Sequence, residues 1–184
     1  MKSCLIVYYS RTGVTEAAAL ALARASGADV EALRPQHTYR NAFGFLRALW
    51  DAVHDVAAPI APVRHNPADY PFIVLGTPVW AGRASAPMRS YILQQQHHFH
   101  RVAVFCTMGG RSGDKAMHDM AILCHREPFA RLCLREREIR TGCYLERITR
   151  FSAELGRLDE ATPSSPISPR NAPRNTSPAA SGGF

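Results

Sequence analysis

An apolar run near the start of the chain, followed by a polar loop and an alanine-rich segment, constrains the fold most strongly. The run Leu5–Tyr9 combines aliphatic, β-branched and aromatic residues, which is typical of a buried strand. It ends at a cluster of Ser, Thr and Gly in residues 10–15. Residues 17–25 are then dominated by Ala and Leu, which favour a helix. The chain therefore opens with a strand, a hydroxyl-rich loop and a helix.

The loop between this strand and this helix is suited to binding an anion. Backbone N–H groups at a helix N-terminus have no intrahelical acceptor and carry partial positive charge. Ser10, Thr12 and Thr15 add hydroxyl donors, so the stretch predicts a site for a phosphate monoester. Taken alone, the stretch is equally compatible with Ser10 or Thr12 acting only as a cap of the helix.

The same arrangement is predicted twice more along the chain. The apolar run 72–76 leads into a loop at residues 77–83 and a helix at 87–94. The run 102–106 leads into a glycine-rich loop at 107–113 and a helix at 114–125. The remaining predicted elements are a strand at 30–33, a helix at 42–56 with a wide apolar face, a Pro-rich loop at 59–71, a weaker edge strand at 132–139 and a helix at 142–158.

This alternation of strands and helices predicts an α/β three-layer sandwich with a five-stranded parallel sheet. In the strand order 2-1-3-4-5, the three polar loops follow neighbouring strands, the first, third and fourth. Ligands of such sheets bind at the carboxyl ends of the strands, near the topological switch point. The three loops are therefore expected to converge on one pocket.

The length and composition predict one folded domain at residues 1–159 and a disordered tail at 160–184. The chain has 184 residues, of which 46% are hydrophobic, enough for a single core. The tail contains mostly Pro, Ser, Asn and Gly, which cannot bury enough apolar surface to fold. The first apolar run is too short to span a bilayer and lacks a small-residue cleavage site, so neither a membrane segment nor a signal peptide is expected.

The cysteines and the charge limit the classes of partner. The five cysteines form no C-x-x-C pair, which favours reduced thiols in the cytoplasm over a disulfide framework or a zinc site. The histidines at 97, 98 and 100 have no Cys or carboxylate to complete a ligand set, so no metal is predicted. The net charge of +7 suits anionic partners, but the arginines are scattered and no RNA-binding module is present, so nucleic acid is not expected.

The three loops together resemble those of the flavodoxin family over residues 3–158. The first loop resembles the FMN-phosphate loop, and residues 77–82 resemble the loop that brackets the isoalloxazine ring. Residues 107–110 match the third loop in position and character. The cofactor-binding residues implied by this resemblance are Ser10, Arg11, Thr12, Gly13, Val14, Thr15, Thr77, Pro78, Val79, Trp80, Ala81, Gly82, Thr107, Met108, Gly109 and Gly110.

The resemblance implies FMN as the cofactor, with no metal and no catalytic side chain of the protein's own. It implies that the hydroxyls of the first loop hold the phosphate and that Trp80 stacks on the flavin ring. The peptide Ala81–Gly82 matches the one that turns its carbonyl toward flavin N5, and Gly permits that rotation. The basic charge departs from the family's electron carriers, which usually dock basic partners through an acidic rim.

Three functions remain open at this stage. One is an electron carrier that serves a redox partner protein, and another is an FMN-dependent NAD(P)H:quinone-type oxidoreductase. The third is a non-catalytic interaction module, against which the intact loops argue. Either a monomer or a homodimer is expected.

Other phosphate-binding classes fit the sequence poorly. The chain lacks both the P-loop and the dinucleotide fingerprint. Cys106 and Arg111 do not match the loop of cysteine phosphatases, because four residues separate them where that class has five. Cys106 is also expected to lie inside a strand.

Overall fold

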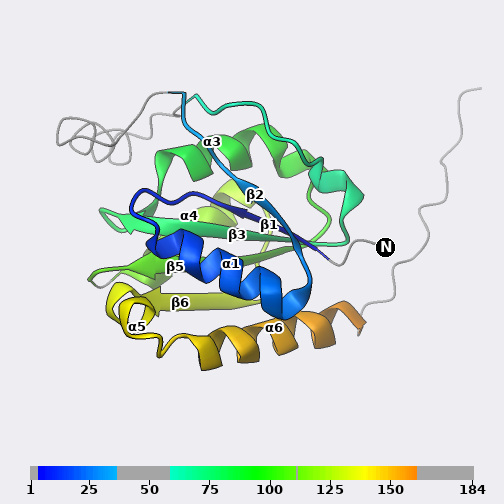
Figure 1. Ribbon diagram of the computed structural model, residues 1–184. Coiled ribbons are helices and arrows are strands. Elements are labelled where there is room, and N and C mark those ends of the chain that lie inside the picture. The colour runs from blue at the N-terminus through cyan, green and yellow to red at the C-terminus, as the bar shows by residue number, and fades with distance from the viewer. Residues whose placement is uncertain (1–3, 37–58, 111, 161–184) are drawn as a thin grey trace, which may run out of the picture.

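The computed structural model describes residues 4–36, 59–110 and 112–160, and within them a parallel sheet forms the centre of the molecule (Figure 1). Its strands are β1 (Leu5–Tyr8), β2 (Asp29–Ala32), β3 (Ile73–Trp80), β5 (Val102–Met108) and β6 (Arg131–Arg135). They lie in the order β2-β1-β3-β5-β6. Counted along the chain as parallel strands, this is the predicted order 2-1-3-4-5, so the predicted fold class is confirmed.

Helices cover both faces of the sheet and complete the three layers. Helices α1 (Val14–Ser26) and α6 (Leu145–Glu160) lie on one face, and α3 (Ala86–Gln95) and α4 (Gly113–Cys124) lie on the other (Figure 1). The short helix α5 (Glu136–Thr141) follows β6 directly. Two 3-10 helices, η1 (Pro67–Asp69) and η2 (Gln96–His98), lie in the connections to β3 and β5. None of the helices in the described ranges is sufficiently long and apolar to cross a bilayer.

Alternating side chains of each strand supply two separate cores. On β1, Leu5 and Val7 belong to the cluster that also contains Met88 of α3. Ile6, between them, belongs to the opposite cluster, which contains Leu22 of α1. All of these side chains are buried. The strand is a near-continuous apolar run because both faces of a covered parallel sheet need apolar side chains.

Gly76 of β3 allows a close approach between β3 and β5. Its register partner is Phe105, and a Cβ at Gly76 would lie 2.1 Å from a carbon of the Phe105 ring. We expect Gly76→Ala to lower the free energy of unfolding by about 1–3 kcal/mol, the usual cost of overpacking a core. Urea denaturation would measure the loss, with Gly110→Ala as the matched control, because a Cβ at Gly110 meets nothing within 4 Å. If Gly76→Ala costs as much in a Phe105→Leu background, the steric explanation is wrong.

The structure corrects several predicted element boundaries. Residues 77–80 were expected in a loop but form the second half of β3, and a two-residue strand, β4 (Arg83–Ala84), pairs antiparallel with Val79 and Trp80. Residues 107–108 were also expected in a loop but end β5. The strand predicted at 132–139 ends at Arg135, and α5 takes its second half. The first helix begins at Val14, earlier than predicted, and the last begins at Leu145, later than predicted. The helix predicted at 42–56 lies outside the described residues.

The boundary between domain and tail stays a prediction, because residues 161–184 also lie outside the described residues. Helix α6 continues to Glu160, beyond which the sequence has no apolar periodicity. We expect deletion of residues 161–184 to leave the melting temperature nearly unchanged in differential scanning calorimetry. A fall of several degrees would show that these residues stabilise the domain.

Candidate functional site

The loop after β1 and the carboxyl-terminal segments of β3 and β5 meet around one cavity of about 410 Å³, within the usual range for small-molecule sites. All sixteen predicted cofactor-binding residues are described by the structure, and ten of them line this cavity. The ten are Arg11, Thr12, Val14, Thr15, Pro78, Val79, Trp80, Thr107, Met108 and Gly109. The predicted convergence of the three loops is therefore present. The binding role of each residue stays a prediction.

The first loop is shaped by Ser10 and Gly13, neither of which lines the cavity. Gly13 precedes α1 with a φ of 88°, a left-handed conformation that suits glycine. Its N–H donates to Ser10 Oγ over 3.1 Å, and the helix makes no side-chain cap hydrogen bond. Ser10 therefore orders the loop rather than capping the helix. Thr12 is exposed and lines the cavity, beside first-turn amides that lack intrahelical acceptors.

Thr15 and Thr107 join the first loop to β5. Both side chains are buried, and their Oγ atoms lie 2.8 Å apart. One hydroxyl donates to the other, so the accepting hydroxyl keeps its own proton for a third partner. This pair fixes two walls of the cavity relative to each other.

The connection from β3 to β4 is a tight two-residue turn at Ala81 and Gly82. Their φ angles are 50° and 75°, which matches the left-handed pair that a two-residue hairpin requires. Thr77 secures the hairpin: its Oγ accepts from the Ser85 N–H over 2.9 Å and donates to Ser85 Oγ over 3.0 Å. Thr77, Ala81 and Gly82 do not line the cavity, and neither does Gly110. Thr77 and the turn fix the hairpin that carries Trp80, and the role predicted for the Ala81–Gly82 peptide stays a prediction.

Trp80 has a packing role as well as a place in the cavity wall. Its side chain is only 8% exposed, and its ring meets the Tyr9 ring edge-on, with centroids 5.6 Å apart. Burial raises the pKa of Tyr9 to about 12, so this neighbour stays protonated at neutral pH. Because Trp80 also lines the cavity, its predicted stacking on a flat ligand remains open to test.

Two residues of the cavity wall, Glu136 and Arg140 of α5, were not predicted from the sequence. The Arg140 guanidinium donates to Glu136 Oε1 through Nε at 3.0 Å and through a terminal nitrogen at 2.6 Å. Glu136 fell within a predicted strand, and Arg140 lay just beyond it. The helical signal was Glu138, whose carboxylate accepts from the Arg135 N–H over 2.6 Å, and this hydrogen bond lowers the pKa of Glu138.

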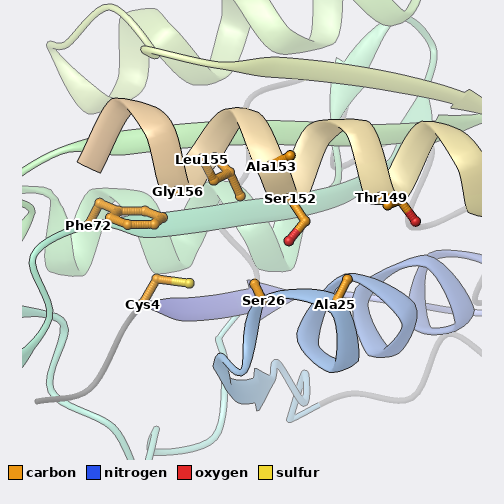
Figure 2. Close-up of a pocket in the computed structure, with 9 residues that line it drawn as sticks. All are labelled: Cys4, Ala25, Ser26, Phe72, Thr149, Ser152, Ala153, Leu155 and Gly156. Carbon is orange, nitrogen blue, oxygen red and sulfur yellow. The ribbon is translucent and has the colours of Figure 1, made fainter. Parts of the chain in front are cut away.

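A second cavity of about 410 Å³ lies between α1 and α6 (Figure 2). Two of its lining residues, Cys4 and Phe72, come immediately before β1 and β3. This cavity therefore lies at the amino ends of the strands, whereas ligands of open α/β sheets bind at the carboxyl ends. The cavity at the three polar loops is the candidate functional site.

Comparison with known sequences gives one family and one curated relative. The sequence model of the flavodoxin family matches residues 3–129. A protein of Cupriavidus metallidurans named NAD(P)H dehydrogenase (quinone) is 38% identical over 100 residues. The match covers 51% of this chain and 47% of that relative, so the chain spans about half the length of the curated relative it matches.

Solved structures of flavoproteins share the fold. A flavoprotein of Lactobacillus acidophilus in complex with FMN aligns with a TM-score of 0.64 and 18% identity, over 77% of this chain and 98% of that chain. A Fusobacterium nucleatum flavodoxin bound to flavin mononucleotide aligns with a TM-score of 0.55 and 12% identity, over 86% of this chain and 99% of that chain.

Proposed function

The chain belongs to the flavodoxin family, and on this premise we propose that it binds FMN at the candidate site and transfers electrons through it. The observation that carries the proposal is the meeting of the loop after β1 with the carboxyl-terminal segments of β3 and β5 around one cavity. When bound, FMN supplies the redox chemistry, and the protein supplies binding, orientation and electrostatics.

The first loop fits the phosphate end of FMN. The exposed Thr12 offers a hydroxyl donor, and the first-turn amides of α1 offer N–H groups in a field of partial positive charge. Arg11 adds a full positive charge to the same wall. These donors suit a dianionic monoester, and their neighbour Thr15 is oriented by its bond to Thr107.

The opposite walls fit the flavin ring. Pro78, Val79, Trp80 and Met108 provide mostly apolar side chains, which favour a flat aromatic ligand over water. Glu136 and Arg140 close the remaining side with an ion pair. On these walls the chain's own side chains would orient a flat ligand and exclude water from the Trp80 side.

A second candidate function is FMN-dependent reduction of a quinone-type acceptor by NAD(P)H. Two observations favour it: the name of the Cupriavidus relative, and the Arg11 guanidinium at the cavity, which suits an anionic dinucleotide. The electron carrier would instead exchange electrons with a redox partner protein. A non-catalytic module gains no support, because ten of the predicted cofactor-binding residues surround a cavity of the size that small-molecule ligands occupy.

An anaerobic titration of the FMN-loaded protein separates these functions. We expect dithionite to bleach the flavin absorbance in either case, because it reduces flavin directly and needs no physiological electron donor. Bleaching by NADPH, followed by reoxidation on addition of a quinone, would establish the oxidoreductase. If dithionite bleaches the flavin and NADPH does not, the function is that of an electron carrier. A protein that retains no FMN during the titration would contradict both.

The wider setting is also part of the proposal. The five cysteines form no C-x-x-C pair, and the setting proposed from this pattern is the reducing environment of the cytoplasm. The expected partners are therefore a redox protein or NAD(P)H with a quinone-type acceptor, rather than nucleic acid or a membrane. The oligomeric state is expected to be a monomer or a homodimer.

A further inference from the structure

Three sulfur atoms lie together on β5 and β6, beside the candidate FMN site. Cys106 and Cys133 are register partners on these adjacent strands, and their Sγ atoms are 3.4 Å apart. Met108 Sδ lies 3.7 Å from Cys133 Sγ. Gly113 of α4 covers the pair so closely that a Cβ there would lie 2.2 Å from Cys133 Sγ. The fold therefore holds two thiols in contact before any reaction.

The two thiols have different surroundings. Cys106 is fully buried, and its S–H donates to Cys133 Sγ. Cys133 is only half-buried and lines a cavity of about 530 Å³ with several charged residues. Those residues are Asp114, Arg135, Arg137, Glu138 and Arg147. Cys133 is therefore the thiol that a small molecule reaches first.

The same contacts decide which thiol ionises. The hydrogen bond from Cys106 lowers the pKa of the Cys133 thiol, and the nearby Arg147 charge acts in the same direction. Burial and the carboxylates of Asp114 and Glu138 oppose this shift without reversing it. For Cys106, the hydrogen bond to Cys133 and burial raise the pKa. Because the thiolate is the nucleophile, reactivity and access coincide at Cys133.

We propose that Cys133 and Cys106 form a peroxide-reactive dithiol, in which Cys133 reacts first and Cys106 closes a disulfide. The proposal rests on the contact between the two sulfur atoms and on the opening at Cys133, and does not depend on FMN binding. Met108 lines both the candidate FMN cavity and the cavity at Cys133, so the two redox centres would share one wall.

The reaction has two balanced steps. The Cys133 thiolate attacks one oxygen of a hydroperoxide, the S–O bond forms as the O–O bond breaks, and the released alkoxide or hydroxide takes up a proton. Cys106 Sγ then attacks Cys133 Sγ. The S–S bond forms as the S–OH bond breaks, and the departing hydroxide leaves as water with the Cys106 proton. In total, two thiols and one hydroperoxide give one disulfide and one water. The other product is an alcohol from an organic hydroperoxide and a further water from hydrogen peroxide.

Peptide mapping of the full chain after treatment with hydrogen peroxide tests the proposal. Trypsin cleavage at Arg101, Arg111, Arg131 and Arg135 places Cys106 in peptide 102–111 and Cys133 in peptide 132–135. After alkylation of remaining thiols, we expect these two peptides to appear as one linked species, two hydrogens lighter than their sum. Dithiothreitol should separate them. Recovery of both peptides in alkylated form would overturn the proposal.

Variants assign the order of the two steps. Cys106→Ser should leave a sulfenic acid at Cys133 that dimedone traps, because the second thiol is missing while a hydroxyl remains to donate to Cys133 Sγ. Cys133→Ser should leave Cys106 reduced, whereas trapping at Cys106 in this variant would contradict the assigned order. The matched control is Cys143→Ser, since Cys143 is exposed and lies outside the pair. This control should form the 102–111 and 132–135 link as the unchanged protein does, and loss of the link would contradict the proposal.

Discussion

Thr12→Ala is expected to lower the affinity for FMN roughly ten- to hundredfold and to leave the affinity for riboflavin nearly unchanged. Thr12 is exposed on the loop between β1 and α1 and lines the candidate site. A hydrogen bond to a charged group typically contributes about 1.5–3 kcal/mol, and about 1.4 kcal/mol corresponds to a tenfold change in affinity. Riboflavin lacks the phosphate, so it has no such bond to lose. Fluorescence titration of both ligands measures the difference.

The control for Thr12→Ala is Thr149→Ala. Thr149 is also exposed, and its hydroxyl donates to the Leu145 carbonyl on α6, at the cavity on the other end of the sheet. This change should leave both affinities unaltered. If Thr12→Ala lowers the affinities for FMN and riboflavin equally, the first loop does not hold the phosphate and the ligand lies elsewhere.

Trp80→Ala is expected to weaken both ligands and also to destabilise the fold. The side chain is nearly buried and packs edge-on against Tyr9, and removal of such an aromatic typically costs about 3–5 kcal/mol. For a chain of this size that corresponds to a fall of roughly 6–20 °C in melting temperature. Loss of ring stacking should lower the affinities for FMN and riboflavin by a similar factor, roughly fivefold or more.

A milder substitution separates the two roles of Trp80. Trp80→Phe keeps an aromatic face and most of the packing, so it should retain most of the stability and bind both ligands with intermediate affinity. Calorimetry reports the first effect and fluorescence titration the second. Unchanged affinities in a folded Trp80→Ala variant would assign the stacking role to another aromatic residue.

The parallel sheet could be predicted because its signal is local. Each buried strand is a short apolar run, and the polar loop after it marks the carboxyl end. The second half of β3 could not be predicted, because Pro78 argues against a strand and the pairing of Val79 with Ala84 appears only in three dimensions. Trp80 was therefore expected on an open loop, whereas it lies in a hairpin against Tyr9.

One local signal and one contact between distant residues account for the rest of what was missed. Arg135 is not one of the residues that usually precede a helix, so the start of α5 went unnoticed and Glu136 was placed in a strand. The contact of Cys106 with Cys133 depends on the register of β5 and β6, which no spacing in the sequence encodes. Sequence reasoning identified the three segments of the site that follow or end β1, β3 and β5. The structure added Glu136 and Arg140 of α5.

The central claim is that the cavity at the three loops binds FMN, and titration of FMN with the purified full chain tests it most directly. We predict that flavin fluorescence changes with protein concentration and saturates at one FMN per chain. The visible absorbance of the flavin should shift at the same stoichiometry, because its ring enters the environment of Trp80. A protein that leaves both the fluorescence and the absorbance of FMN unaltered at saturating concentration would contradict the claim.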